Sequence, residues 1–183
     1  MKLFSLNASR SFGDKVAQAL GISLAEHEER EFEDGEHKVR PLESVRGEDV
    51  YVLQSLNGDP AQGVNERLCR LLFFLGAVRD AGAQRVTAVI PYMAYARKDR
   101  RTKSRDPLTS RYMAMLLEAV GIDAVMTLDV HNPAAFQNAF RCLTHTLDTR
   151  RLFAEYMRER CGDGKVVVAS PDPGGVKRGQ GFK

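Results

Sequence analysis

Short apolar runs alternate with amphipathic stretches from one end of the 183-residue sequence to the other. The runs are nearly continuous in hydrophobic residues, as expected for strands buried on both faces of a parallel sheet. The amphipathic stretches repeat apolar residues every three or four positions, which is the spacing of one helix face. Strands are predicted over residues 2–6, 50–54, 86–90, 124–128 and 166–169.

Four amphipathic helices are predicted between or beside these strands. Ser9 is in position to cap the first helix, which runs to Leu20 and is closed by Gly21. The second helix has the clearest apolar face and ends at Gly82. That face consists of Val64, Leu68, Leu72, Leu75 and Val78. The other two helices are predicted over residues 108–120 and 149–160.

A β-hairpin is predicted before the second of these strands. Extended segments over residues 24–32 and 37–40 flank the dipeptide Asp34-Gly35, which is a hairpin-turn signal. Elsewhere strands and helices alternate, which favours crossover connections and a mainly parallel sheet with helices on both faces. The predicted fold class is therefore α/β.

A domain boundary is predicted near residues 141–148. Residues 1–145 then form an N-terminal domain, and residues 146–183 form the start of a second, similar domain. The second part has only one predicted helix and one predicted strand, whereas a crossover unit needs a further helix and strand. We therefore expect a truncated chain, whose last residues are too few to bury a core of their own.

Composition favours a globular protein in an aqueous compartment, with 43% hydrophobic and 28% charged residues. The N-terminus has no apolar run of signal-peptide length, and no stretch approaches the roughly 20 apolar residues that cross a bilayer. A cytoplasmic location without membrane association is expected. The cysteines Cys69, Cys142 and Cys161 lack disulfide or zinc-site spacing, and Cys69, among leucines, is expected to pack in the core.

Polar loops follow four of the predicted strands. Their sequences are SLNGDP, YARKDRRTKSRD, DVHN and SPDPGG. The carboxyl ends of parallel strands meet at one edge of a sheet, and ligands of such sheets bind there. Because packing alone does not explain so many polar groups at one edge, the sequence predicts a binding site at this place.

The second of these loops, residues 95–106, holds much of the positive charge of a chain whose formal net charge is only +3. Arginine binds phosphate through charge-assisted hydrogen bonds, so one interpretation is a small phosphorylated ligand such as a triphosphate. A solvated surface loop is the alternative. A nucleic-acid interface is less favoured, because no aromatic residue lies between the charges. The cations are Arg97, Lys98, Arg100, Arg101, Lys103 and Arg105.

Two further groups of residues have both a functional and a structural interpretation. Asp129 and His131 lie on one side of an extended segment, and Asp172 is in position to approach them. Carboxylates suit Mg²⁺, but histidine is an unusual magnesium ligand, so a transition metal or no metal stays open. A capping aspartate and a hydrogen-bonded histidine also explain the pattern. Likewise, residues 32–36 are either a simple tight turn or a base-binding loop.

Taken in this order and spacing, the motifs resemble those of the ribose-phosphate pyrophosphokinase family. The likeness extends from near residue 1 to Arg178. The segment IPYxxYARxDR, followed by DPLT and DVH, is highly specific. The matching stretches are FEDGE, DVYVLQS, IPYMAYARKDRRTKSRDPLTSRYMAMLLEAVG, TLDVH and VVASPDPGGVKR.

The resemblance implies two tandem domains of the phosphoribosyltransferase type, a Rossmann-like fold, with the active site at their junction. It implies transfer of the ATP diphosphoryl group to the C1 hydroxyl of ribose 5-phosphate, giving phosphoribosyl pyrophosphate and AMP for nucleotide biosynthesis. The implied cofactor is Mg²⁺, and inorganic phosphate is a candidate activator. The implied partners are the two substrates and further copies of the chain, without nucleic acid or membrane.

The resemblance also assigns roles to individual residues. Phe32, Asp34 and Glu36 would bind adenine, typically in the site of a neighbouring subunit. Arg97, Lys98 and Asp99 would form the ATP-binding loop, and His131 and Asp172 would bind the metal. The family's catalytic lysine and arginine, and its ribose 5-phosphate loop, lie beyond the GGVKR stretch. No catalytic residue is therefore expected in these 183 residues, which we expect to be inactive alone.

Three departures from the family pattern indicate a divergent branch. Lys98 stands where glutamine is common, and Pro173 replaces the usual alanine of SPDAGG. The segment HNPAAFQNAF differs from the common HxxQIQGFF and is one residue longer. A non-catalytic homologue that associates with catalytic subunits is one alternative. Another alternative is an unrelated nucleotide- or RNA-binding module that uses the basic loop. In that case the affinity for RNA would fall steeply with salt concentration and would not depend on Mg-ATP.

Overall fold

The computed structural model describes residues 1–162, 167–170 and 175. The chain divides into two compact units, Met1–Thr146 and Leu147–Lys183. The first unit contains both sheets, apart from the last residue of one strand, and every described helix except the last.

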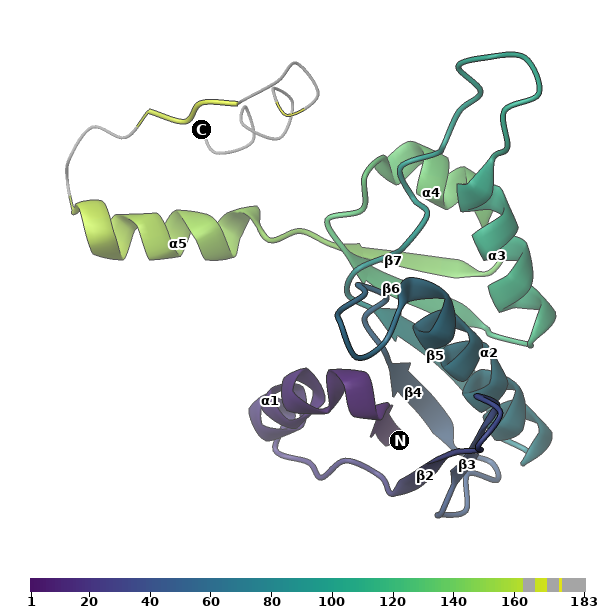
Figure 1. Ribbon diagram of the computed structural model, residues 1–183. Coiled ribbons are helices and arrows are strands. Elements are labelled where there is room, and N and C mark those ends of the chain that lie inside the picture. Colours follow the sequence, from purple (N-terminus) through teal and green to yellow (C-terminus); the bar gives the residue numbers. More distant parts are fainter. Residues whose placement is uncertain (163–166, 171–174, 176–183) are drawn as a thin grey trace. The chain divides into compact units, whose positions relative to one another are not determined.

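A five-stranded sheet with the order β1-β4-β5-β6-β7 forms the centre of the first unit (Figure 1). Strands β1, β4, β5 and β6 pair in parallel, with Lys2 opposite Val50, Val50 opposite Val86, and Thr87 opposite Ala124. A separate antiparallel pair, β2 and β3, is the predicted hairpin. The predicted α/β fold with a mainly parallel sheet is thus confirmed. The strands are β1 (Lys2–Ser5), β2 (His27–Glu31), β3 (His37–Pro41), β4 (Asp49–Leu53), β5 (Arg85–Ile90), β6 (Ala124–Leu128) and β7 (Leu143–Leu147).

All four predicted helices are present, with small shifts at their ends. Gly82 follows the end of the second one with a φ of +88°, a left-handed conformation that favours glycine. The short helix α4 and the strand β7 were not predicted. Helix α4 is too brief to show a periodic face, and β7 lies in the segment interpreted as a domain boundary. The helices are α1 (Arg10–Leu20), α2 (Val64–Asp80), α3 (Thr109–Ala119), α4 (Pro133–Ala139) and α5 (Arg150–Cys161), with a 3-10 turn over Asn7–Ser9.

The two faces of the sheet bury different partners. Phe4 and Val52 face the larger hydrophobic cluster, which includes the buried hydrophobic residues of α2 and α3 and reaches Val39 of the hairpin. Leu3 and Leu53, their neighbours along the strands, face a smaller cluster with α1. This alternation follows from the two-residue period of a strand. Helices therefore cover both faces, as predicted.

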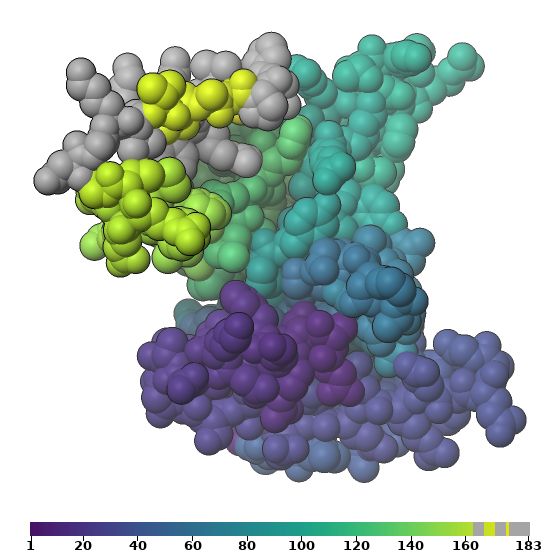
Figure 2. Space-filling view, turned by 60° about the vertical axis from the view of Figure 1, so that its left-hand side comes forward, coloured from purple at the N-terminus to yellow at the C-terminus, as the bar shows by residue number. Residues whose placement is uncertain are grey.

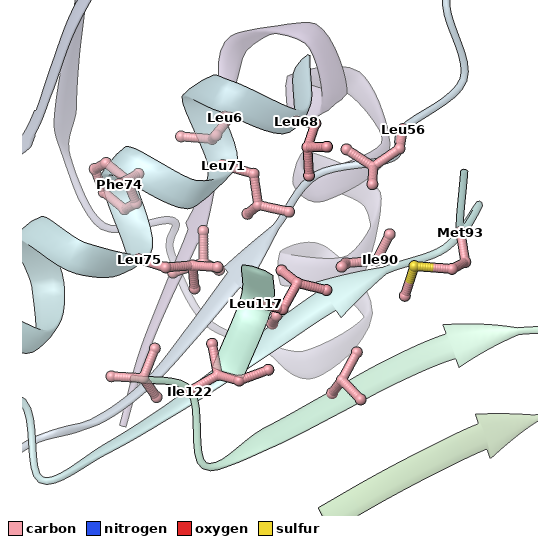
Figure 3. Packing of buried hydrophobic residues seen from close by; sticks show 14 of the residues in the cluster. Leu6, Leu56, Leu68, Leu71, Phe74, Leu75, Ile90, Met93, Leu117 and Ile122 are labelled. Carbon is pink, nitrogen blue, oxygen red and sulfur yellow. The ribbon is translucent and has the colours of Figure 1, made fainter. Parts of the chain in front are cut away.

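Helix α2 supplies much of the larger cluster. Figure 3 shows Leu71, Phe74 and Leu75 projecting from α2 into the cluster that also contains Leu117 of α3. Phe74 is fully buried and makes an edge-to-face contact with Phe4, with ring centroids 5.2 Å apart. Burying a side chain of this size contributes about 1.5–3 kcal/mol. The position of α2, and of whatever rests on it, is therefore strongly determined.

Three local predictions were wrong. The side chain of Ser9 does not cap α1, because its hydroxyl accepts a hydrogen bond from the Ser55 amide at 2.8 Å. Cys69 is exposed, because it lies on the side of α2 that turns away from the buried residues. The strand predicted over residues 166–169 is absent from its described part, since residues 167–170 are irregular and Val167 is 87% exposed.

In the second unit, α5 is the helix predicted over residues 149–160. It begins beside Asp148, whose carboxylate accepts a hydrogen bond from the Arg150 amide at 2.8 Å. None of the residues of α5 is buried. Its exposed apolar side chains are Leu152, Phe153, Tyr156 and Met157.

Candidate functional site

The loops that follow β4, β5 and β6 meet at the carboxyl edge of the sheet, as parallel pairing requires. The Leu56 amide, after β4, donates a hydrogen bond to the Tyr92 carbonyl, after β5, at 3.1 Å. The Leu128 amide, at the end of β6, donates to the Pro91 carbonyl at 3.2 Å. Backbone hydrogen bonds therefore link neighbouring loops at the predicted place.

A side-chain hydrogen bond joins two of the predicted motifs directly. The side-chain amide of Asn132 donates to the carboxylate of Asp99 at 2.8 Å. The side-chain oxygen of Asn132 accepts from the Ala135 amide at 3.2 Å and so caps α4. Asn132 thus fixes the loop after β5 to the loop after β6. The fourth predicted loop, with Asp172 and Pro173, lies outside the described residues.

The basic loop, residues 95–106, is fastened where it meets α3. The Tyr95 carbonyl accepts from the Thr109 hydroxyl at 3.1 Å, and the Lys98 carbonyl accepts from the Ser110 amide and hydroxyl at 3.3 and 3.2 Å. Tyr95 and Arg105 have φ values of 60° and 66°, which residues other than glycine rarely adopt. Such conformations persist only where the surroundings determine them, and they cluster at functional sites.

Inside the basic loop, Asp106 collects several donors. Its carboxylate accepts from the Lys98 ammonium at 2.5 Å, from the Thr102 hydroxyl and amide at 2.8 and 3.0 Å, and from the Lys103 amide at 2.8 Å. Lys98 and then Thr102 hold the pKa of Asp106 well below its usual range. The Lys98 side chain, half-buried, is therefore engaged within the loop, unlike its exposed cationic neighbours.

Arg97 is the exposed cation nearest the strand end. One of its terminal nitrogens lies 3.5 Å from the Tyr92 hydroxyl, which is a weak contact that a ligand could replace. The other exposed cations of the basic loop are Arg100, Arg101, Lys103 and Arg105. The loop thus presents a concentration of positive charge to solvent at the carboxyl edge, which suits a polyanion of small size.

The Asp129-Val130-His131 segment is only partly open. Val130 is buried and Asp129 half-buried, whereas His131 is exposed. Asp129 has a φ of 39°, a third left-handed residue at this edge. Among the described residues, no three side chains from histidine, cysteine, aspartate and glutamate gather closely enough to hold a metal ion.

An open hollow lies at the carboxyl edge on the β1 side. Its lining comes from the segments after β1, β4, β5 and β6 and includes Ser9, Ser55, Asn57 and Arg67. The Arg67 side chain is only 3% exposed and forms an ion pair with Asp59. The hollow can hold a small polar group, but the ion pair offsets the charge of Arg67.

The predicted base-binding turn is the exposed tip of the β2–β3 hairpin. The Phe32 amide donates to the Glu36 carbonyl at 2.8 Å, and the Asp34 carboxylate accepts from the Glu36 amide at 3.0 Å. Gly35 has a φ of +88°, which explains the glycine at this corner. Phe32 is 43% exposed, and the Arg30 guanidinium lies 5.4 Å from its ring centroid. An exposed aromatic ring with two nearby carboxylates is able to stack on a base and accept its hydrogen bonds.

The base of the hairpin rests on a charged network that is centred on the buried Arg70 of α2. Arg70 forms ion pairs with Glu31 at 2.7 Å, Glu66 at 2.8 Å and Glu29 at 3.5 Å. Burial by itself would raise the pKa of Glu29, but the hydrogen bonds from His27 and from the Asn7 amide outweigh it and lower that pKa. The side chains of Arg70 and Glu29 are 4% and 3% exposed.

Other contacts complete this attachment. The imidazole of His37 stacks on Phe73 of α2 with ring centroids 5.3 Å apart, and His27 contacts Phe74 at 5.5 Å. Burial, followed by the positive charge of Arg70, lowers the pKa of His37.

The structure does not bring the hairpin tip and the basic loop of one chain together. They lie at opposite ends of the first unit in Figure 1 and form separate parts of its surface in Figure 2. The predicted site residues therefore form two groups. Arg97, Lys98, Asp99 and His131 share the carboxyl edge, and Phe32, Asp34 and Glu36 share the hairpin tip.

The structural roles of three residues near the site were not predicted from the sequence. Asn132 had a signal, because an asparagine before proline is a helix start, and Pro133 is the first residue of α4. Arg67 and Arg70 had none, since arginine on a helix is ordinarily solvated and both are buried here.

The profile of the N-terminal domain of ribose phosphate pyrophosphokinase matches residues 1–121. The chain belongs to the ribose-phosphate pyrophosphokinase family. The ribose-phosphate pyrophosphokinase of Hyphomonas neptunium is 43% identical over 178 residues, which cover 97% of this chain and 55% of that protein. Ribose-phosphate pyrophosphokinase 1 of Streptococcus pyogenes serotype M1 is 40% identical over 179 residues, 97% of this chain and 54% of that one.

A solved structure agrees with these relatives. The crystal structure of phosphoribosylpyrophosphate synthetase from Mycobacterium smegmatis superposes with a TM-score of 0.91 at 32% identity, covering 99% of this chain and 59% of that chain. The chain therefore spans a little more than half the length of the family members it matches. Within its described residues, every helix is too short or too polar to span a bilayer.

Proposed function

We propose that this chain is the nucleotide-binding N-terminal portion of a ribose-phosphate diphosphokinase. The complete enzyme transfers the diphosphoryl group of ATP to the C1 hydroxyl of ribose 5-phosphate and releases AMP. Membership of the family supports the reaction class. The observation on which the nucleotide site rests is the Asn132–Asp99 hydrogen bond, because it joins the loop that bears Arg97 to the loop that bears His131.

The chemistry fits the groups at this edge. Diphosphoryl transfer needs positioning and neutralisation of phosphate charge more than covalent catalysis. Arg97 is exposed and its contact with Tyr92 is weak, so it is available to a phosphate oxygen. Lys98 reaches the nucleotide only by giving up its ion pair with Asp106. Asp99, fixed by Asn132, orients the loop. No catalytic residue is assigned within the 183 residues.

The metal in this proposal is Mg²⁺ that arrives with ATP. Magnesium keeps most of its waters and substrate oxygens and needs only one or two protein ligands. His131, exposed at the end of β6, and Asp172 are the proposed ligands. When bound, the ion neutralises charge on the transferring group.

Adenine binding is assigned to a second copy of the chain. Phe32, Asp34 and Glu36 are exposed, and they lie apart from the basic loop of their own chain (Figure 1). A symmetric homo-oligomer would place the hairpin tip of one copy beside the basic loop of another. A cytoplasmic location, activation by inorganic phosphate and the absence of nucleic acid from the assembly complete the proposal.

Titration with Mg-ATP tests the nucleotide site. Arg97→Ala should weaken binding by on the order of 1.5–3 kcal/mol, the value of a hydrogen bond to a charged group. Arg101→Ala, which removes the same charge from the same loop, is the matched control and should have a much smaller effect. Equal losses would mean that the loop acts only through its overall charge. Unchanged affinity in Arg97→Ala would remove that residue from the site.

Subunit mixing tests the shared site. Arg97→Ala and Phe32→Ala chains should each bind Mg-ATP weakly, whereas a mixed oligomer contains some sites with both residues intact. Partial recovery of binding on mixing is the expected result. No recovery in an oligomer shown by light scattering to exchange subunits would count against the assignment of Phe32 to a neighbouring site.

Incubation with both substrates tests the assignment of catalysis. The 183-residue polypeptide alone, with Mg-ATP, ribose 5-phosphate and inorganic phosphate, should bind nucleotide weakly and release no AMP. Loss of even one preorganised group costs a factor of about 10²–10³ in rate, and here a whole loop of such groups is assigned elsewhere. AMP release that depends on ribose 5-phosphate would place the catalytic groups within these residues.

A further inference from the structure

One guanidinium stands among three carboxylates at the base of the hairpin. Arg70 of α2 contacts Glu29 and Glu31 of β2, and Glu66 one turn earlier on its own helix. The side chain of Arg70 is 4% exposed, and so is nearly shielded from solvent, as is that of Glu29 at 3%, whereas the carboxylates of Glu31 and Glu66 are 67% and 40% exposed. Without the guanidinium, the carboxylates of β2 would face the carboxylate of α2 with nothing between them, and the end of β2 would be repelled from the helix.

The place of Glu31 makes this network relevant to the tip. Glu31 is the last residue of β2 and directly precedes Phe32. The Arg70–Glu31 contact therefore fastens the chain immediately before the turn, whereas the Arg70–Glu29 contact fastens it two residues earlier. On the other strand, His37 is the first residue of β3 and stacks on Phe73. Both ends of the turn are thus attached to the same helix.

The turn's own hydrogen bonds determine its shape but not its direction. The Phe32 amide bonds the Glu36 carbonyl, and the Gly35 amide bonds the Phe32 carbonyl at 3.1 Å. All of these partners belong to the turn itself. The direction in which the exposed Phe32, Asp34 and Glu36 point relative to the body of the unit is set where the strands meet α2.

We propose that Arg70, through Glu31, is the positioning residue that orients the Phe32–Glu36 turn for its nucleotide. The inference rests on the proposed adenine-binding role of the turn and assigns to α2 a part in nucleotide affinity. Arg70 itself touches no substrate. It acts by holding the end of β2 at a fixed direction, so that the turn needs less reordering on binding.

Nucleotide titration of the native full-length protein separates this role from simple stabilisation. Glu31→Gln should weaken Mg-ATP binding about three- to tenfold, as expected for a change within a coupling network. Glu66→Gln is the matched control, because it also removes one carboxylate charge that pairs with Arg70 but leaves the contacts between Arg70 and β2 in place. The affinity of the Glu66→Gln protein for Mg-ATP should stay within about twofold of that of the parent protein. Arg70→Met should weaken binding at least as much as Glu31→Gln, and Arg70→Lys should restore part of it.

A double variant tests whether the effect passes through the turn. In a Phe32→Ala background, Glu31→Gln should cause no further loss of affinity, because the residue that it orients is gone. A full additional loss there would overturn the inference, and so would equal effects of Glu31→Gln and Glu66→Gln in the parent.

Hydrogen exchange distinguishes failure of the inference from failure of the proposed function. If Phe32→Ala leaves Mg-ATP affinity unchanged, the adenine-binding role of the turn is wrong. The positioning role is then decided by the amides of Phe32 and Gly35, which are bonded within the turn. Positioning by Arg70 is supported if these two amides exchange faster in Glu31→Gln but not in Glu66→Gln, while the exchange rates of the β5 amides stay the same in both variants. Unchanged exchange at the turn overturns it.

Discussion

The β2–β3 hairpin and the basic loop both present proposed nucleotide-binding residues, yet opposite kinds of contact hold them. At the hairpin, the central contact with α2 joins Arg70 to Glu29, whose side chains are only 4% and 3% exposed, and Glu31, 67% exposed, adds an outer contact with the same guanidinium. The basic loop is attached through partly exposed hydrogen bonds and an ion pair between Lys98 and Asp106. A buried charged contact is strong and costly to break, whereas an exposed one is weak and easily exchanged.

This difference suits different tasks. A turn that serves a neighbouring subunit must keep one direction before the partner arrives, and a firm attachment provides that. A loop that closes on a polyphosphate must exchange its internal contacts for contacts with the ligand. Each of the following predictions would break or sharpen this comparison.

The largest effect is expected from Glu29→Gln. The Glu29 carboxylate accepts from His27 at 3.0 Å, from the Asn7 amide and from Arg70. Loss of its charge should reduce the free energy of unfolding by about 2–3 kcal/mol, the range for buried hydrogen bonds between charged groups. Chemical denaturation measures this. Glu28→Gln, the adjacent residue, pairs with Arg40 at the surface and should have little effect. Similar losses in both variants would show that the hairpin attachment is not special.

Asn132→Ala should have the next largest effect. It removes the cap of α4, which is worth about 1 kcal/mol, and frees Asp99. Thermal unfolding should show a modest loss of stability, and Mg-ATP affinity should fall as the two loops separate. Asn138→Ala, an exposed substitution within the same helix, is the control. Normal nucleotide affinity in Asn132→Ala would mean that the link between the loops is not needed for binding.

Acid should loosen the hairpin before the basic loop. The pKa of His37 is lower in the folded protein than its ordinary value of 6.5, so the unfolded chain binds a proton more tightly at this residue. The contribution of neutral His37 to the free energy of unfolding is therefore lost as pH falls below about 6.5. The pKa of Glu29 is also lowered, and its contribution is lost as pH falls below about 4.5. The pKa of Asp106 is lowered much further, so the ion pair between Asp106 and Lys98 persists to more acidic pH. Exchange protection factors at successive pH values measure the order, and earlier loosening of the loop would contradict it.

The smallest effect is expected from Lys98→Met. The ion pair with Asp106 is partly exposed, and such pairs contribute little to stability. The free energy of unfolding should change less than in Asn132→Ala and should become less dependent on salt. A loss as large as that of Glu29→Gln would mean that the basic loop is as firmly held as the hairpin.

The sequence predicted elements well where a local hydrophobic or turn pattern is clear, and poorly where tertiary contacts decide. The β6 strand was predicted with its observed bounds, and the turn at Asp34-Gly35 was correct. The seven residues of α4 fall below the length at which a repeat is visible, although Asn132 and Pro133 form a helix-start signal.

The site residues show the same contrast between what local sequence predicts and what tertiary contacts decide. Placement of polar loops at strand ends predicted that the segments bearing Arg97 and His131 would be neighbours, because parallel pairing alone brings them together. Nothing local indicates that Arg70 is buried, since its partners Glu29 and Glu31 come from strand residues far away in the sequence. Motif spacing likewise does not reveal that Lys98 is paired with Asp106.

The strand order has a consequence for synthesis on the ribosome. Lys2 pairs with Val50, and no residue between β1 and β4 belongs to the main sheet. The first strand therefore emerges long before its partner and must remain unpaired while the whole hairpin is made. The hairpin pairs neighbouring residues and is able to form early, because local contacts cost little chain entropy. Before α2 appears, its contacts with the rest of the chain are limited to those with the N-terminal segment, such as the hydrogen bond from the Asn7 amide to Glu29. We expect the nascent chain to gain its first stable structure only when α2 and β5 have left the exit tunnel, joining β1, β4 and the hairpin in one step.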